Sequence, residues 1–128
     1  MKLKSIHHIA IIASDYNKSK SFYTQILGLH ILKETYRQER ESYKLDLALN
    51  GQYIIELFSF PKYASRATRP EATGLRHLAF VVDNVDEAVQ ELRSKHIPVE
   101  DVRVDKITGK KFTFFFDPDH LPLELYES

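Results

Sequence analysis

A chain of 128 residues that is 43% hydrophobic and 28% charged has the size and composition of one folded domain, neither disordered nor fibrous. Lysine plus arginine and aspartate plus glutamate each number 18, so no net field would draw the protein to nucleic acid or to an acidic membrane surface. The absence of cysteine excludes disulfides, thiolate metal sites and a cysteine nucleophile, so any metal would need His, Asp or Glu ligands.

The first half of the chain predicts a strand, a helix and three further strands. The run from His8 to Asp15 is a short β-rich segment that ends in a residue suited to begin a helix. Residues 17–27 carry apolar side chains at helical spacing, and Gly28 follows where helices commonly end. Asn50-Gly51 predicts a tight hairpin between the last two strands. The three strands are expected at residues 30–37, 43–49 and 52–60.

The second half repeats this order. His77 to Asp83 resembles the run at His8, and Asn84 and Glu87 have the spacing of a helix capping box. A helix and strands at residues 99–105, 110–116 and 121–126 follow. We therefore predict an α+β fold in which two βαβββ modules form curved mixed sheets around a metal-centred cavity. One domain spans residues 1–128, with modules at about 4–60 and 75–127 and a loop, 61–74, whose length suits a segment that closes over a site.

Two pairs of polar residues recur at matching places in the repeat. His8 and Glu56 are 48 positions apart, and His77 and Glu124 are 47 positions apart. Each glutamate lies within the last predicted strand of its module. If the first and last strands of a module share a sheet, each module offers one His and one Glu to the same face. Two modules would then offer two of each to one cavity.

Two imidazoles and two carboxylates suit a divalent transition metal, namely Zn²⁺, Ni²⁺, Co²⁺, Fe²⁺ or Mn²⁺. Coordination would also explain why Glu56 stands among apolar residues in a predicted core strand. A strand histidine or glutamate alone is more often structural, but four that coincide under a repeat favour one metal site. We therefore predict His8, Glu56, His77 and Glu124 as metal ligands.

Further substrate-binding candidates lie in the second module. Arg103, Lys110 and Lys111 stand at the edge of the aromatic run 112–116 and could hold an anionic group, although lysines at a strand edge also block aggregation. Phe115 is a candidate for the cavity wall. The first residues contain no apolar segment of signal-peptide length and no later run reaches the length of a membrane span, so a cytoplasmic location is expected.

The sequence resembles the vicinal oxygen chelate superfamily, which contains glyoxalase I, fosfomycin-resistance thiol transferases, extradiol dioxygenases and bleomycin-binding proteins. The resemblance covers nearly the whole chain. It rests on Ile6-His-His-Ile-Ala-Ile-Ile12, Ser21-Phe-Tyr23, Leu27-Gly-Leu29, Leu75-Arg-His-Leu-Ala-Phe80, Asp117-Pro-Asp119 and Leu123-Glu-Leu-Tyr-Glu127.

The family's ligand positions fall on the four residues that the repeat had selected. A glutamate at position 56 is similar to glyoxalase I, since the transferase and dioxygenase branches use two His and one Glu. The resemblance implies a metal-dependent lyase or isomerase, of the lactoylglutathione lyase type, acting on a 2-oxoaldehyde–thiol adduct or a related vicinal-oxygen substrate. Glu124, or else Glu56, would move the proton between carbons. It also implies a homodimer with sites at the subunit interface, although an intrachain site stays open. The alternatives are a thiol transferase or dioxygenase on the same metal, or a non-enzymatic antibiotic-binding protein.

The sequence departs from the family at three informative positions. Ile12 and Phe60 replace the arginine and asparagine that hold the thiol's carboxylates in glutathione-using bacterial glyoxalase I, which argues against glutathione itself. Phe60 is a further candidate for substrate binding, with an apolar side chain where the family has a polar one. His120 follows Asp117-Pro-Asp where the family usually has glycine, so the turn there is expected to differ.

Overall fold

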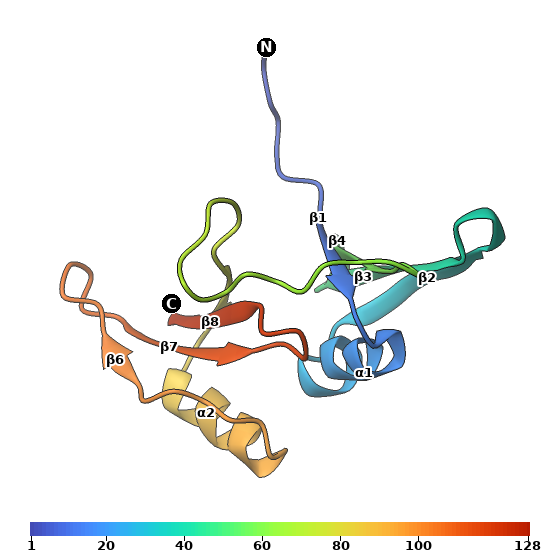
Figure 1. Ribbon diagram of the computed structural model, residues 1–128. Coiled ribbons are helices and arrows are strands. Elements are labelled where there is room, and N and C mark those ends of the chain that lie inside the picture. Colours follow the sequence, from blue (N-terminus) through green and yellow to red (C-terminus); the bar gives the residue numbers. More distant parts are fainter. The chain divides into compact units, whose positions relative to one another are not determined.

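The computed structural model describes residues 1–128 and contains two compact units, Met1–Ser65 and Arg66–Ser128. Each unit holds one four-stranded mixed sheet and one α-helix, and the first unit also has a short 3-10 helix at Gln38–Arg40 (Figure 1). The order of elements within each unit is strand, helix and three strands. The predicted α+β fold with two βαβββ modules is confirmed.

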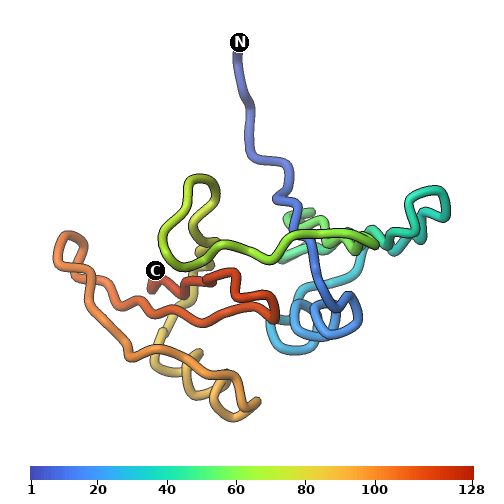
Figure 2. The backbone as a smooth tube through the Cα atoms, viewed as in Figure 1, coloured from blue at the N-terminus to red at the C-terminus, as the bar shows by residue number.

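In the first unit, the sheet has the order β1-β4-β3-β2, with β1 parallel to β4 and the other pairs antiparallel. The elements are β1 (Ile9–Ala13), α1 (Tyr16–Ser21) with a π-helical turn (Phe22–Ile26), β2 (His30–Arg37), β3 (Ser42–Leu49) and β4 (Gln52–Ser59). The N-terminal end of the chain extends away from the rest of the first unit (Figure 2). The parallel pair at β1 and β4 fixes which residues of these strands lie side by side.

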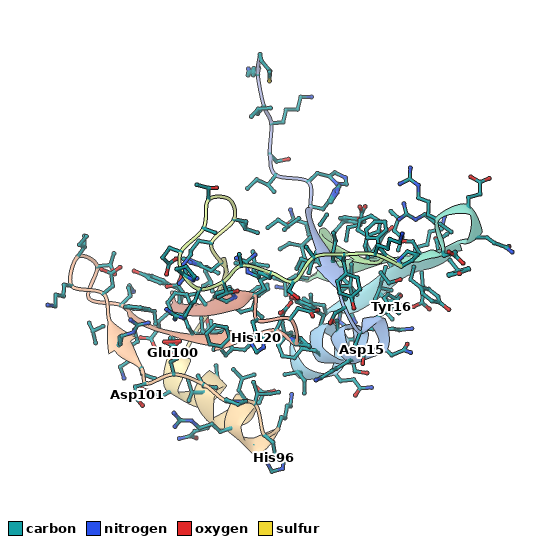
Figure 3. The ribbon with its side chains drawn as sticks, viewed as in Figure 1. Asp15, Tyr16, His96, Glu100, Asp101 and His120 are labelled. Carbon is teal, nitrogen blue, oxygen red and sulfur yellow. The ribbon has the colours of Figure 1, made fainter.

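The helix of the first unit begins where the sequence predicted. Asp15, labelled in Figure 3, precedes α1, and its side chain accepts a hydrogen bond from the backbone N–H of Lys18. Beyond the helix, Tyr16 and Lys20 both donate to the carboxylate of Glu34 on β2, with Lys20 Nζ at 2.8 Å. These contacts tie the helix to the far strand of the sheet.

The second unit repeats this plan with the order β5-β8-β7-β6. Asn84 caps its helix by accepting from the backbone N–H of Glu87 at 3.0 Å, as the capping-box spacing predicted. The elements are β5 (Leu78–Val82), α2 (Val85–Ser94), β6 (Arg103–Val104), β7 (Lys111–Phe116) and β8 (Pro122–Glu127). No helix of either unit is both long enough and apolar enough to cross a lipid bilayer.

The strand predicted at residues 99–105 is the largest difference. Only Arg103–Val104 pairs as a strand, with an isolated bridge between Val99 and Phe115. Between them, the hydroxyl of Thr113 lies 2.8 Å from the carbonyl oxygen of Glu100 and 3.3 Å from that of Asp101. Because a side chain takes the bonds that a neighbouring strand would make, the ladder is interrupted there.

Each sheet buries one face. In the first unit the buried face carries Leu45, Ile55 and Leu57, all fully inaccessible to solvent. In the second, Phe115 and Leu123 lie on the corresponding face. Burying a side chain of this size contributes about 1.5–3 kcal/mol. The opposite faces carry the histidines, glutamates, arginines and exposed aromatic rings described next.

Candidate metal centre

The first unit brings His8 and Glu56 together. Glu56 pairs with Ala10 across β1 and β4, and His8 stands two residues before Ala10, so both side chains lie on one face. His8 Nε2 is 3.7 Å from Glu56 Oε2. On the other side of the ring, His8 Nδ1 lies 2.8 Å from His7 Nδ1. That contact holds the imidazole in place. One of the two nitrogens donates and the other accepts, so the tautomers of the two rings depend on each other.

The second unit contains the equivalent pair. Glu124 pairs with Ala79, and His77 stands two residues before that alanine. His77 Nε2 lies 3.0 Å from Glu124 Oε2. The ring of Phe114 meets the His77 ring edge-on with centroids 5.1 Å apart. The register expected from the repeat is therefore present in both sheets.

The donor types fit a divalent cation. Imidazole nitrogen and carboxylate oxygen lie side by side in each unit, and all four side chains are partly accessible to solvent. Neither unit by itself holds a group of three or more His, Asp or Glu side chains that could bind a metal ion. Each unit thus holds two of the four predicted ligands, and the metal centre stays a prediction.

Glu56 has polar partners that the sequence analysis did not identify. The hydroxyl of Tyr53 lies 2.8 Å from Glu56 Oε2 and also 2.8 Å from Asp46 Oδ1. Lys44 Nζ lies 2.8 Å from Asp46 and 3.4 Å from Glu56. Burial and the two carboxylates raise the pKa of the Tyr53 hydroxyl, so it remains a hydrogen-bond donor. Glu56 therefore has a hydrogen-bonding partner and a nearby lysine within its own sheet, both of which it shares with Asp46.

A β-bulge explains why Tyr53 was missed. Simple alternation along the strand would place Tyr53 and Glu56 on opposite faces. In the structure, Leu47 pairs with Ile55 but Ala48 pairs with Tyr53, so Ile54 is an extra residue in β4. The bulge turns Tyr53 onto the face of Glu56. Counting back from the Asn50-Gly51 turn without a bulge would place Asp46 opposite Ile55, so the pairing of Asp46 with Glu56 also depends on the bulge.

Among the substrate-binding candidates, Arg103 lies on the sheet face that carries Glu124. Its guanidinium carbon is 5.0 Å from the ring centroid of Phe112 and 5.5 Å from that of Phe114. Phe114 pairs directly with Glu124. Phe115, expected in the cavity wall, is instead fully buried on the other face. Because strand side chains alternate, Phe114 takes the place next to His77 that was expected for Phe115.

The other candidates have different surroundings from those expected. Lys111 Nζ lies 2.5 Å from the carboxylate of Asp86, in the first turn of α2, and Lys110 Nζ donates to the carbonyl oxygen of Ser128 at 2.6 Å. Both lysines are thus engaged within their own unit and do not stand free to hold an anion. Phe60 stacks on Phe58 with ring centroids 5.5 Å apart.

The turn at residues 117–121 accommodates a histidine at the glycine position. Asp117 Oδ1 accepts from the backbone N–H of Asp119 and of Leu121, so this carboxylate stabilises the turn. His120 adopts a φ of 64°, in the region that glycine prefers. Its carbonyl oxygen accepts from the hydroxyl of Thr68 at 2.7 Å, which ties the second part of the loop 61–74 to this turn.

The repeat, the paired strands and the two His–Glu pairs agree with the family to which almost the whole chain can be matched. Residues 5–125 match the family described as the Glyoxalase/Bleomycin resistance protein/Dioxygenase superfamily. The chain belongs to this superfamily. The resemblance inferred from the motifs is therefore confirmed.

Its near relatives do not name an activity. The chain is 68% identical to the uncharacterized protein YwkD of Bacillus subtilis, over 99% of both chains. It is 62% identical to the uncharacterized protein YaeR of Escherichia coli, over 98% of this chain and 97% of the relative. A crystal structure of a glyoxalase family protein from Enterococcus faecalis is 50% identical, with a TM-score of 0.91 over 99% of this chain and all of the other.

More distant relatives carry named activities. A lactoylglutathione lyase of Schizosaccharomyces pombe is 28% identical over 98% of this chain and 48% of its own length. The metallothiol transferase FosB of Staphylococcus saprophyticus is 29% identical over 97% of this chain and 77% of its own length. Lyases and transferases thus both occur among proteins similar to this chain.

Proposed function

We propose that this protein is a metal-dependent, glyoxalase I-like lyase or isomerase that acts on a small 2-oxoaldehyde–thiol adduct or a related vicinal-oxygen substrate. The observation that carries the proposal is the repeated His–Glu pair. Each pair sits at the same register of its sheet, with the glutamate opposite an alanine and the histidine two residues before that alanine. Small alanine side chains leave space beside the ligands for a substrate.

The proposed ligands are His8, Glu56, His77 and Glu124, the first two from one unit and the last two from the other. A divalent cation held by them would supply Lewis-acid polarisation of two neighbouring substrate oxygens. The metal stays open among nickel, zinc, cobalt, iron and manganese, since the donor set suits each of them. We further propose that the protein works in the cytoplasm as a homodimer.

The two glutamates have different surroundings, which suggests different roles. Glu56 Oε2 is engaged by the Tyr53 hydroxyl and lies near Lys44, so this carboxylate is held in place. Glu124 has only His77 as a polar neighbour and lies beside the apolar ring of Phe114. We propose that Glu124 carries the proton between adjacent carbons of the substrate, since it has fewer bonds to break when it moves.

One observation favours a second candidate, a thiol transferase on a three-ligand metal. Tyr53 and Lys44 already give Glu56 a hydrogen-bonding partner and a nearby positive charge, so this glutamate has polar contacts on its strand without a metal. If Glu56 is no ligand, two His and Glu124 remain, and the similarity to FosB gains weight. Glu56→Gln separates the two candidates. It should lower metal content in the first and leave it unchanged in the second.

The experiment that tests the proposed function is metal analysis together with an assay. Wild type and His77→Ala are purified, loaded in turn with Ni²⁺, Zn²⁺, Co²⁺, Fe²⁺ and Mn²⁺, desalted and analysed for bound metal. We expect close to one ion per proposed site in wild type and a large loss in His77→Ala. Loaded wild type is then assayed with methylglyoxal and a panel of small thiols.

His96→Ala is the matched control, because His96 follows the C-terminal end of α2 and is not one of the proposed ligands (Figure 3). It should retain the metal content of wild type. Equal metal in wild type and His77→Ala would contradict the proposed centre. A loaded protein that is inactive with every thiol would contradict the lyase assignment.

A further inference from the structure

Arg37, at the end of β2, lies over the aromatic ring of Phe58 on β4 and that of Phe60 just beyond the strand. Its guanidinium carbon is 4.8 Å from the ring centroid of Phe58 and 5.7 Å from that of Phe60. The two rings are stacked on each other at an interplanar angle of 22°. Together they form a shelf that holds the guanidinium in one orientation.

The shelf lies on the same sheet face as the His8–Glu56 pair. Phe58 is two residues beyond Glu56 on β4 and Phe60 is four, so all three side chains point the same way. Arg37 of β2 pairs with Ser42 of β3, and Lys44 of β3 pairs with Phe58 of β4. Since Ser42 and Lys44 are two residues apart, the side chain of Arg37 lies on the same face as that of Phe58. At roughly 3.3 Å per residue, the shelf is about 7–13 Å from Glu56 along the strand.

The polar atoms of Arg37 are only partly satisfied. Nη2 donates to the hydroxyl of Ser42 at 2.8 Å. Nε is buried and has no hydrogen-bond partner, and no carboxylate pairs with the side chain. Arg103, the arginine over two rings in the second unit, has Glu100 at 3.6 Å. A half-buried guanidinium without an anion is costly, and an anionic ligand would recover that cost.

We propose that Arg37 binds an anionic oxygen group, a carboxylate or a phosphate, of the substrate whose vicinal oxygens meet the His8–Glu56 end of the same face. This inference rests on the proposed function and specifies its substrate class. The substrate would carry a negative charge about 7–13 Å from its reacting carbons, which is the distance between Glu56 and the two rings along the strand. Phe60 would then help to position the anion-binding group. Its ring supports the guanidinium of Arg37, a polar anchor that comes from another strand.

Two matched probes test this assignment. One is a monohydroxamate of a linear dicarboxylic acid, whose hydroxamate presents two vicinal oxygens and whose far end is a carboxylate. The other is the same molecule with a neutral amide at the far end. Calorimetric titration of Co²⁺-loaded wild type should give at least about tenfold tighter binding of the carboxylate. Chain lengths of four to ten carbons should show an optimum set by the shelf distance.

Arg37→Met keeps an unbranched apolar stem on the rings and removes the charge. It should abolish the preference for the carboxylate and leave the affinity for the amide unchanged. Arg40→Met, a neighbouring exposed arginine, is the control that loses the same charge and should keep the preference. A preference that survives in Arg37→Met would overturn the Arg37 assignment while leaving the metal centre intact.

A measurement on metal-free protein separates this proposal from the proposed function. In protein with ¹⁵N-labelled arginine, glutarate or inorganic phosphate should shift the Nε–H resonance of Arg37, whereas glutaramide should not. Comparison of the two anions tells whether carboxylate or phosphate is preferred. No shift with either anion would overturn the proposal, even if hydroxamates bind at the metal. A shift without any hydroxamate binding would support Arg37 and contradict the metal centre.

Discussion

The hydroxyl of Tyr53 lies 2.8 Å from Glu56 Oε2, although simple strand alternation would place these two residues on opposite faces. The same hydroxyl lies 2.8 Å from Asp46, and a single O–H can be donated to only one carboxylate at a time. Lys44 lies near both acids and supplies a positive charge that they share. Glu56 is therefore part of a local network whose geometry depends on the bulge at Ile54.

Tyr53→Phe should destabilise the protein without changing its fold. The substitution keeps the ring and removes the one hydroxyl that lies against two partly buried carboxylates. We expect a loss of about 1–3 kcal/mol in the free energy of unfolding at neutral pH. Urea denaturation followed by circular dichroism measures it. Tyr36→Phe, at an exposed position of β2, is the control and should change stability by less than about 0.5 kcal/mol. Equal effects of the two variants would show that the Tyr53 hydroxyl contributes nothing specific.

How far the sequence predicts this network depends on the kind of signal. The repeat, the helix caps and the His–Glu spacing follow from local pattern, and the structure places each pair on one face. The position of Tyr53 could not be predicted, because a one-residue bulge leaves no mark in the alternation of residues 52–60. Phe115 was misplaced for a simpler reason. In a run of four aromatic residues out of five, hydrophobicity does not indicate which alternate set faces the helix.

The Arg37 shelf illustrates a second limit. Sequence comparison at position 60 registers a phenylalanine in place of a polar residue and therefore suggests that an anchor is lost. Only the pairing of β2, β3 and β4 brings Arg37 over Phe58 and Phe60. Which residues of these strands lie side by side depends on the pairing register. The register depends on the geometry of the turns, so the sequence of a single strand does not predict it.

The Asp46–Lys44 pair should make stability depend on pH in the acid range. Burial would raise the pKa of Asp46, but hydrogen bonds from Lys44 and Tyr53 outweigh it and leave the pKa below its ordinary value of 3.8. A lowered pKa means that the pair stabilises the fold above this value, and that the contribution is lost as the pH falls through the folded-state pKa. Lys44→Met should move that loss of stability to higher pH. Urea midpoints between pH 2 and 6, in chelator-treated protein, measure the shift.

Lys33→Met is the matched control for this prediction, since Lys33 acts on Asp46 only through its charge and donates no hydrogen bond to it. It should move the acid transition less than Lys44→Met does. Identical acid transitions for wild type and Lys44→Met would show that the hydrogen bond at 2.8 Å does not control the titration of Asp46.

His120→Gly should stabilise the protein. His120 holds a φ of 64°, where a side chain with a Cβ is disfavoured and glycine is not. Its contacts in the turn are made by the backbone, including the carbonyl oxygen that accepts from Thr68, and glycine preserves them. We expect a gain of about 0.5–1 kcal/mol, measured by thermal or urea unfolding. His30→Gly, within β2, should instead lower stability, because glycine in a strand loses more conformational freedom on folding. A loss of stability in His120→Gly would mean that the imidazole makes a contribution larger than the backbone strain.

Mixing two inactive variants should show whether the proposed metal centre is built by one chain or by two. His8→Ala and His77→Ala each remove one ligand from every site. If a site combines His8 and Glu56 of one subunit with His77 and Glu124 of its partner, a mixed dimer contains one site with both defects and one site with none. Random reassociation should then restore about a quarter of the wild-type metal content and activity. If all four ligands come from one chain, every site keeps a defect and the mixture stays as low as its components. The same mixture of Glu56→Gln with Glu124→Gln tests the carboxylates independently of the histidines.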